Sequence, residues 1–105
     1  MKIYEAQQGF IVLSQAKLDG LSTEEKHKVI KVARSLKSVA KEFEEFITDT
    51  QERVADKVEA SKIIESEANK ETEVEIEKLG DTMDKMMDHN SWNVAQIMLL
   101  EDLVK

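Results

Sequence analysis

Apolar residues recur at every third or fourth position along most of this chain, which is the spacing of amphipathic helices. Over residues 3–18 this spacing predicts a first helix, with Gly20 just past its end. Glycine suits that position because it readily adopts the left-handed conformation that often ends a helix. A short strand over residues 1–4 is the alternative for the beginning of this segment.

The dominant predicted element is one long helix from residue 22 to about residue 67. Ser22-Thr23-Glu24-Glu25 has the Ser-x-x-Glu form of a capping box, and Leu21 precedes it as half of a hydrophobic staple. A straight helix of about 45 residues would be about 67 Å long, which is longer than a compact domain of this size. Because the apolar spacing also shifts after Ile47, we expect the helix either to break within residues 50–68 or to project into a coiled coil or a partner.

Residues 71–77 carry two conflicting patterns. Glutamate alternates there with Thr72, Val74 and Ile76, and strict alternation with β-branched residues is typical of a strand. The same apolar residues also continue a helical spacing that reaches the methionines further along the chain. The pattern therefore leaves strand and helix both open, and a strand here would pair with residues 1–4.

The last part of the chain predicts two further helices. A short one runs from Gly80-Asp81 to Met87, and a final one is capped by Asn90 or Ser91. The final helix is apolar nearly all round, so we expect it to be buried in the fold or in an interface. Together these elements predict a mostly α single domain over residues 1–105, with three or four helices, one long central helix and at most a minor two-stranded β pairing.

The composition narrows the class of protein. Hydrophobic residues make up 41% of the chain and aromatic residues only 5%, which predicts an aliphatic core filled with methionine. Cysteine is absent, and no apolar run approaches the roughly 20 residues that span a bilayer. Because the beginning of the chain also lacks a signal-peptide pattern, we expect a cytoplasmic protein that makes no membrane contact.

Charge is distributed unevenly along the chain. Residues 1–41 hold eight Lys or Arg against four Asp or Glu, whereas residues 42–105 hold seven against eighteen. The formal net charge of −7 argues against general binding to nucleic acids or anionic membranes and favours a basic partner.

A basic arc on the long helix lies opposite its apolar face and spans about 80° around the helix axis. It consists of Lys26, Arg34, Lys37 and Lys41. Phosphate contact is one interpretation of this arc, but no aromatic residue is interleaved for base stacking. Pairing with the acidic second half of the chain, within the molecule or between subunits, is the preferred interpretation.

The chain carries no recognisable catalytic motif. A phosphate-binding glycine loop and a nucleophile elbow are both absent. Glu24 and His27 match only half of a di-iron ligand pair. Asp81, Asp84 and Asp88 gather three carboxylates on one helix face, but they lack the pattern of a calcium loop. We therefore expect a protein that is not an enzyme and has no catalytic residue, metal site or cofactor.

Two functions fit these patterns. The first is a non-catalytic helical protein that binds itself or a basic host protein through its final helix and an apolar stripe. Residues of the stripe are Phe43, Phe46, Ile47, Val54 and Val58. Trp92 is either an interface anchor or a residue that closes the core.

The alternative is an acidic inhibitor that mimics nucleic acid and blocks a nucleic-acid-binding protein of a host defence system. Rows of carboxylates along a helix or strand can imitate phosphates. The acidic surface would consist of Glu71, Glu73, Glu75, Glu77, Asp81, Asp84 and Asp88.

The order of elements resembles that of small helical phage and prophage proteins of unknown function, which are encoded near tail and morphogenesis genes. The residues that carry the resemblance are Phe10-Ile11-Val12-Leu13, the run from Ser22 to Phe46, Glu73-Val74-Glu75-Ile76 and Ile97-Met98-Leu99-Leu100. It implies a small assembly protein of phage origin and assigns no functional residue. Small acidic phage inhibitors of host defence nucleases share the size and composition of this chain.

Overall fold

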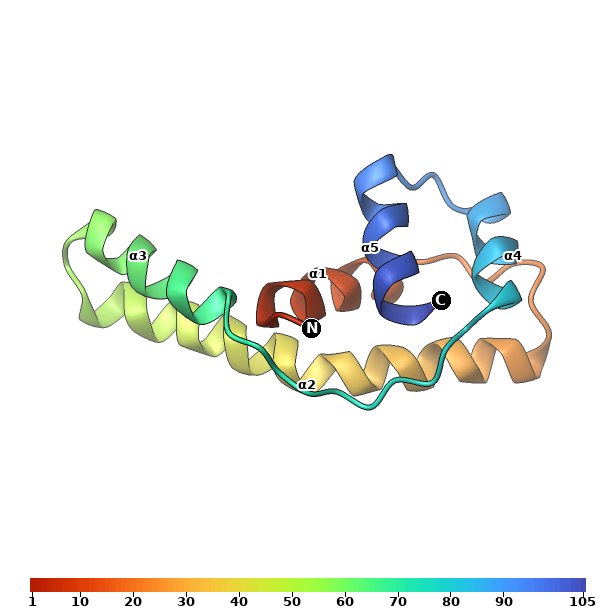
Figure 1. Cartoon of the computed structure of the whole chain (residues 1–105), viewed down its shortest axis with the longest axis horizontal. Helices are drawn as coiled ribbons and strands as arrows, with labels where there is room; N and C mark the ends of the chain where they lie inside the picture. Colours follow the sequence, from red (N-terminus) through yellow and green to blue (C-terminus); the bar gives the residue numbers. More distant parts are fainter.

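One long helix runs the length of the molecule (Figure 1). The structure is a computed structural model that describes all 105 residues. Its five helices are α1 (Ile3–Ser14), α2 (Thr23–Arg53), α3 (Lys57–Ala68), α4 (Asp81–His89) and α5 (Val94–Val104). The α1 and α3 helices pack against α2, which is the long helix, and α5 packs on α1. The predicted mostly α fold with a long central helix is confirmed, but the chain forms five helices rather than three or four.

The beginning of α2 is fixed by the predicted capping box. The Ser22 hydroxyl accepts a hydrogen bond from the Glu25 backbone N–H at 3.1 Å, and a Glu25 carboxylate oxygen accepts one from the Ser22 backbone N–H at 3.0 Å. These bonds satisfy two of the donors that every helix leaves free at its N-terminus.

The helix that the pattern extends to residue 67 is divided by a turn at residues 54–56. Val54 has extended backbone angles, and the Asp56 carboxylate then caps α3 by accepting from the backbone N–H groups of Val58 and Glu59. The α3 helix folds back beside the end of α2, so the two form an antiparallel hairpin (Figure 1). The molecule is consequently 49 Å long, much shorter than a straight helix would require.

The main core lies between α1, the first half of α2, α4 and α5. It is a single cluster of 13 buried apolar residues, in which Leu36, Met83, Met86 and Leu100 are almost fully enclosed. Ala40, Phe43 and Ala60 are also buried but lie outside this cluster. The hairpin therefore has a small buried region of its own, separate from the main core.

Residues 71–79 form neither a helix nor a strand but an extended segment that crosses α2 (Figure 1). Its only β-type pairing is an isolated antiparallel bridge between Lys2 and Glu71, supported by a 2.8 Å bond from the Thr72 N–H to the Met1 carbonyl. The helical interpretation of this segment is wrong, and the predicted two-stranded pairing with residues 1–4 is reduced to this single bridge, without strands. The alternation itself is real, because all four glutamates are exposed while Val74 and Ile76 pack against the core.

The ends of two helices differ from the sequence-based expectation. The α1 helix stops at Ser14 rather than residue 18, and Gly20, with φ of +80°, lies in the turn that leads into α2. The α5 helix is capped by Asn93, whose side chain accepts from the Gln96 N–H at 2.8 Å. Asn90 does not cap it, because its side chain bonds both the N–H and the carbonyl of Lys17.

Candidate interaction surfaces

The predicted apolar stripe on the long helix is divided by the fold of the hairpin. Phe43 is buried, Phe46, Ile47 and Val54 are half-buried, and Val58 is 65% exposed. Turning α3 back over α2 encloses the first part of the stripe and leaves Val58 at the outer end. A hollow of about 450 Å³ lies at this end and is lined by residues that include Val54, Ala60 and Ile64.

The outer face of α5 presents two of the three most exposed large apolar side chains of the molecule, the third being Val58. Val94 is 72% exposed and Met98, one turn further along, is 60% exposed. The opposite face of the same helix is buried through Leu100, Leu103 and Val104. The final helix is therefore buried on one side only, although its sequence is apolar nearly all round.

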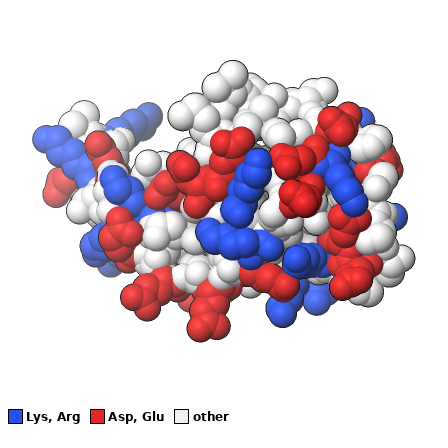
Figure 2. Space-filling view, turned by 45° about the vertical axis from the view of Figure 1, so that its right-hand side comes forward, with Lys and Arg blue, Asp and Glu red and all other residues white.

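The surroundings of this face are uncharged on the side where α5 begins, whereas Glu101 and Asp102 lie exposed about one turn beyond Met98. Residues 90–100 contain no charged residue, and neither do residues 6–16, which belong mostly to the neighbouring α1. In Figure 2 the uncharged side chains cover the top of the molecule, where Figure 1 places α5. We name the outer side of α5, with Val94, Ala95 and Met98, the α5 face.

Trp92 precedes α5 rather than lying just inside it. Its side chain is half-buried, packs against the main core and lines a hollow of about 250 Å³ with Val12, Gln15 and Gln96. The residue thus contributes to the core and also borders the α5 face.

The predicted acidic surface is exposed but broken up by cations. Glu77 lies 3.8 Å from both Lys28 and Lys31, and Asp84 lies 3.0 Å from Lys105. The hydrogen bond that the Lys105 ammonium group donates to the Asp84 carboxylate raises the pKa of this ammonium group. Figure 2 accordingly shows acidic and basic side chains interleaved on this side of the molecule rather than one acidic face. Also within this acidic surface, Glu71 pairs with the Met1 amino group at 3.4 Å. The members of the surface that form no ion pair are Glu73, Glu75, Asp81 and Asp88.

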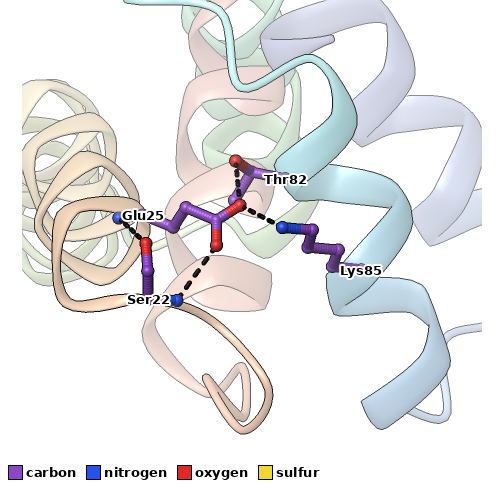
Figure 3. A network of polar contacts seen from close by, with 4 residues as sticks. All are labelled: Ser22, Glu25, Thr82 and Lys85. Atoms are coloured by element: carbon purple, nitrogen blue, oxygen red, sulfur yellow. Dashed lines mark hydrogen bonds and ion pairs between the residues drawn. The ribbon is translucent and has the colours of Figure 1, made fainter.

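Glu25 takes part in the capping box of α2 and also bonds two residues of α4, and the second of these contacts is not visible in the sequence (Figure 3). One carboxylate oxygen completes the capping box, and the other accepts from the Lys85 ammonium group at 2.9 Å and the Thr82 hydroxyl at 3.2 Å. The bond from the Ser22 backbone N–H and then that from Lys85 lower the pKa of Glu25 to about 2, against the opposing effect of burial. Glu25 thus fastens the beginning of α2 to α4.

We expect this carboxylate to make unfolding depend on pH in the acid range. Because the folded-state pKa of about 2 is below the ordinary value of 4.5, the stabilisation is present above pH 4.5 and is lost as the pH falls towards 2. Thermal unfolding followed by circular dichroism should show a steeper acid decline for the wild type than for Glu25→Gln. Glu24→Gln, at an exposed neighbour without a bonded partner, should retain the wild-type slope. Parallel curves for wild type and Glu25→Gln would contradict this role.

The acidic and histidine residues considered as ligands do not come together. Glu24 and His27 are exposed, and no group of three His, Asp or Glu side chains is arranged as a metal site requires. None of the helices is both long enough and apolar enough to cross a membrane.

No protein-family model, curated protein or solved structure matches this chain. Its function has to be inferred from the surfaces described above.

Proposed function

We propose that this protein is a non-catalytic helical binding or assembly protein that self-associates, and that the α5 face is its main contact surface. The observation that supports this proposal is the exposure of Val94 and Met98 on a helix that carries no charged residue before Glu101. Exposed apolar patches of this kind mark interaction sites, because covering them removes apolar area from water. An origin in a phage or prophage stays a hypothesis that rests on the order of elements.

A second copy of the chain is the partner that the charge distribution favours for this face. Two molecules of net charge −7 repel each other wherever their acidic surfaces approach. Val94, Ala95 and Met98 carry no charge, so two copies can meet there in an antiparallel arrangement that keeps the Glu101 and Asp102 carboxylates of the two copies at opposite ends of the contact.

Charge introduced into the α5 face should dissociate the assembly. In sedimentation velocity at high micromolar concentration, we expect the wild type to associate and Val94→Lys/Met98→Lys to remain monomeric. Full burial of one such side chain contributes about 1.5 kcal/mol, and about 1.4 kcal/mol corresponds to a tenfold change in affinity, so the weakening should be tenfold or more.

Val94→Lys and Val58→Lys form a matched pair of single variants, because each adds one positive charge, the first on α5 at a valine that is 72% exposed and the second on α3 at a valine that is 65% exposed. Val94→Lys should already weaken the association, and Val58→Lys is the control. It should associate like the wild type. A compact wild-type monomer at the highest concentration would contradict self-association. Dissociation by Val58→Lys alone would instead place the contact on the hairpin.

The acidic-inhibitor alternative stays a hypothesis. Its support is the exposure of the glutamates that alternate along residues 71–77. Two of the four, Glu71 and Glu77, are paired with cations of the same chain, which leaves Glu73 and Glu75 as the free part of the row. A short interrupted row offers less for phosphate mimicry than the α5 face offers for protein binding.

A further inference from the structure

A second surface suited to self-association runs along the outer side of α2. Eight residues spaced three or four apart lie on one line down this helix, and every one of them is exposed. We name them the α2 seam, and they are Lys26, Ile30, Arg34, Lys37, Lys41, Glu44, Thr48 and Glu52. The buried positions Val29, Val32 and Leu36 face the core instead, so no other element of the chain covers the seam.

The charge of the seam changes sign at its middle. Its first half is basic up to Lys41, and its second half is acidic from Glu44, with Glu45 beside it. None of these charged side chains forms an ion pair within the chain, whereas Lys28 and Lys31 on another side of α2 pair with Glu77. The cations and carboxylates of the seam are therefore both available to a partner.

The order of charges on the seam does not serve the stability of α2 itself. Lys37 and Lys41 are neighbours of like charge on the helix surface, and such pairs are slightly destabilising. A basic beginning and an acidic end also oppose the helix dipole, which favours the reverse arrangement. A partner of complementary charge order would compensate for both effects.

We infer that a second copy of this chain binds antiparallel along the α2 seam, with the twofold axis between Lys41 and Glu44. Reversing the seam about this point places Lys41 opposite the partner subunit's Glu44 and Arg34 opposite the partner subunit's Glu52. Each pair occurs twice, because a twofold interface uses the same patch on both subunits. This inference rests on the proposed self-association and adds a defined surface and orientation to it.

The seam has the dimensions of a weak interface. The stretch from Arg34 to Glu52 is about 27 Å long at 1.5 Å per residue, which is short for a stable protein–protein contact. Exposed ion pairs also contribute little each and are screened by salt. Near the basic end, Ile30 borders an apolar groove of about 210 Å³ that is also lined by Phe10 and Leu13. We therefore expect association at high micromolar concentration that weakens strongly as salt is added.

A charge-swap experiment tests the pairing directly. One variant, Arg34→Glu/Lys37→Glu/Lys41→Glu, makes every charged seam residue from Arg34 to Glu52 acidic. The other, Glu44→Lys/Glu45→Lys/Glu52→Lys, makes every charged residue of this stretch basic. At low salt, sedimentation of an equimolar mixture should show a heterodimer that is at least tenfold tighter than either variant with itself. About 1 M salt, where the Debye length is about 3 Å, should abolish it.

A matched control separates seam pairing from general attraction between oppositely charged proteins. Lys57→Glu/Lys62→Glu and Glu59→Lys/Glu65→Lys change exposed charges of α3, none of which forms an ion pair in the chain. Their mixture should form no heterodimer. Circular dichroism of every variant should show the wild-type helix content, since all the substituted residues are exposed.

The orientation can be tested with introduced cysteines, because the chain has none of its own. In the antiparallel arrangement, Lys37 of one copy lies opposite Thr48 of the other. Oxidation of a mixture of Lys37→Cys and Thr48→Cys chains should therefore give mainly the mixed disulfide, which requires Cα atoms within about 7 Å. Equal amounts of like and mixed disulfides would contradict the antiparallel register.

The outcomes for the two surfaces are distinguishable. If the charge-swap mixture forms no complex while Val94→Lys/Met98→Lys still dissociates the wild type, the α2 seam inference is wrong and the proposed function stands. If the mixture associates and the α5 variant has no effect, the seam is the self-association surface and the α5 assignment is wrong. If neither the wild type nor the mixture associates, both are wrong.

Discussion

Replacing Leu36 by alanine is expected to lower the free energy of unfolding by about 3 kcal/mol. Leu36 is 0% exposed at the centre of α2 and belongs to the main core cluster. Shortening its side chain removes apolar contacts and leaves a cavity that the surrounding helices can only partly fill. Urea denaturation measures the effect, as a lower midpoint with an unchanged slope.

The control for this variant is Ile30→Ala on the same helix. Ile30 is partly exposed, so its truncation should cost less than about 1 kcal/mol when measured on dilute protein. A loss of similar size for both variants would show that Leu36 is not at the centre of the core.

Gly9→Val is expected to destabilise the protein by about 1–3 kcal/mol, even though valine is a better helix former than glycine. Gly9 is buried in α1 where this helix meets α2 and α5. A Cβ atom at this position would lie 2.8 Å from the Leu103 Cδ1 atom and 3.3 Å from the Leu36 Cδ1 atom. The first distance is too short for two carbon atoms, so the side chains around Gly9 would have to move.

Two further variants test the cause of this loss. Gln8→Val, at the exposed neighbouring position, should change the free energy of unfolding by less than about 0.5 kcal/mol. Adding Leu103→Ala to Gly9→Val should destabilise less than the sum of the two single variants, because the shortened leucine makes room for the new side chain. Strict additivity would mean that the close approach to Leu103 is not responsible.

The sequence alone carried information on structural features whose physical cause lies within a few neighbouring residues. The capping box at Ser22 predicted the beginning of α2, because the bonds that form it join residues three apart. The alternation over residues 71–77 left strand and helix both open, and the structure contains the extended alternative, with one buried side and no strand partner beyond Lys2. Both patterns can be recognised without knowledge of distant parts of the chain.

Features that depend on distant contacts were not predictable in the same way. The shift in apolar spacing after Ile47 left a break within residues 50–68 as one of two alternatives, but it did not indicate that α3 would fold back. The turn at residues 54–56 contains neither glycine nor proline, so beyond the cap at Asp56 nothing in its sequence specifies this reversal. Lys85, which binds the second oxygen of Glu25, lies 60 positions away in the chain. Both are consequences of how the helices pack.

The candidate contact surface illustrates the same limit. A helix that is apolar nearly all round does not indicate which side will be covered, because that depends on the elements packed against it. In the structure α5 turns Leu100 and Val104 inward and leaves Val94 and Met98 outside. Likewise, Phe43 is buried in the folded chain, although its place on the apolar stripe predicted that it would contact a partner.

The extended segment is held in place by its ends and its side chains rather than by its own backbone. The chain provides no backbone–backbone hydrogen bond for residues 73–78, whereas Thr72 bonds the Met1 carbonyl and Leu79 bonds the Val104 carbonyl. Amide protons between these two points should therefore exchange quickly with solvent even while Val74 and Ile76 remain packed. Hydrogen exchange alone would classify the segment as unfolded, and only a probe of the side chains would reveal that it is ordered.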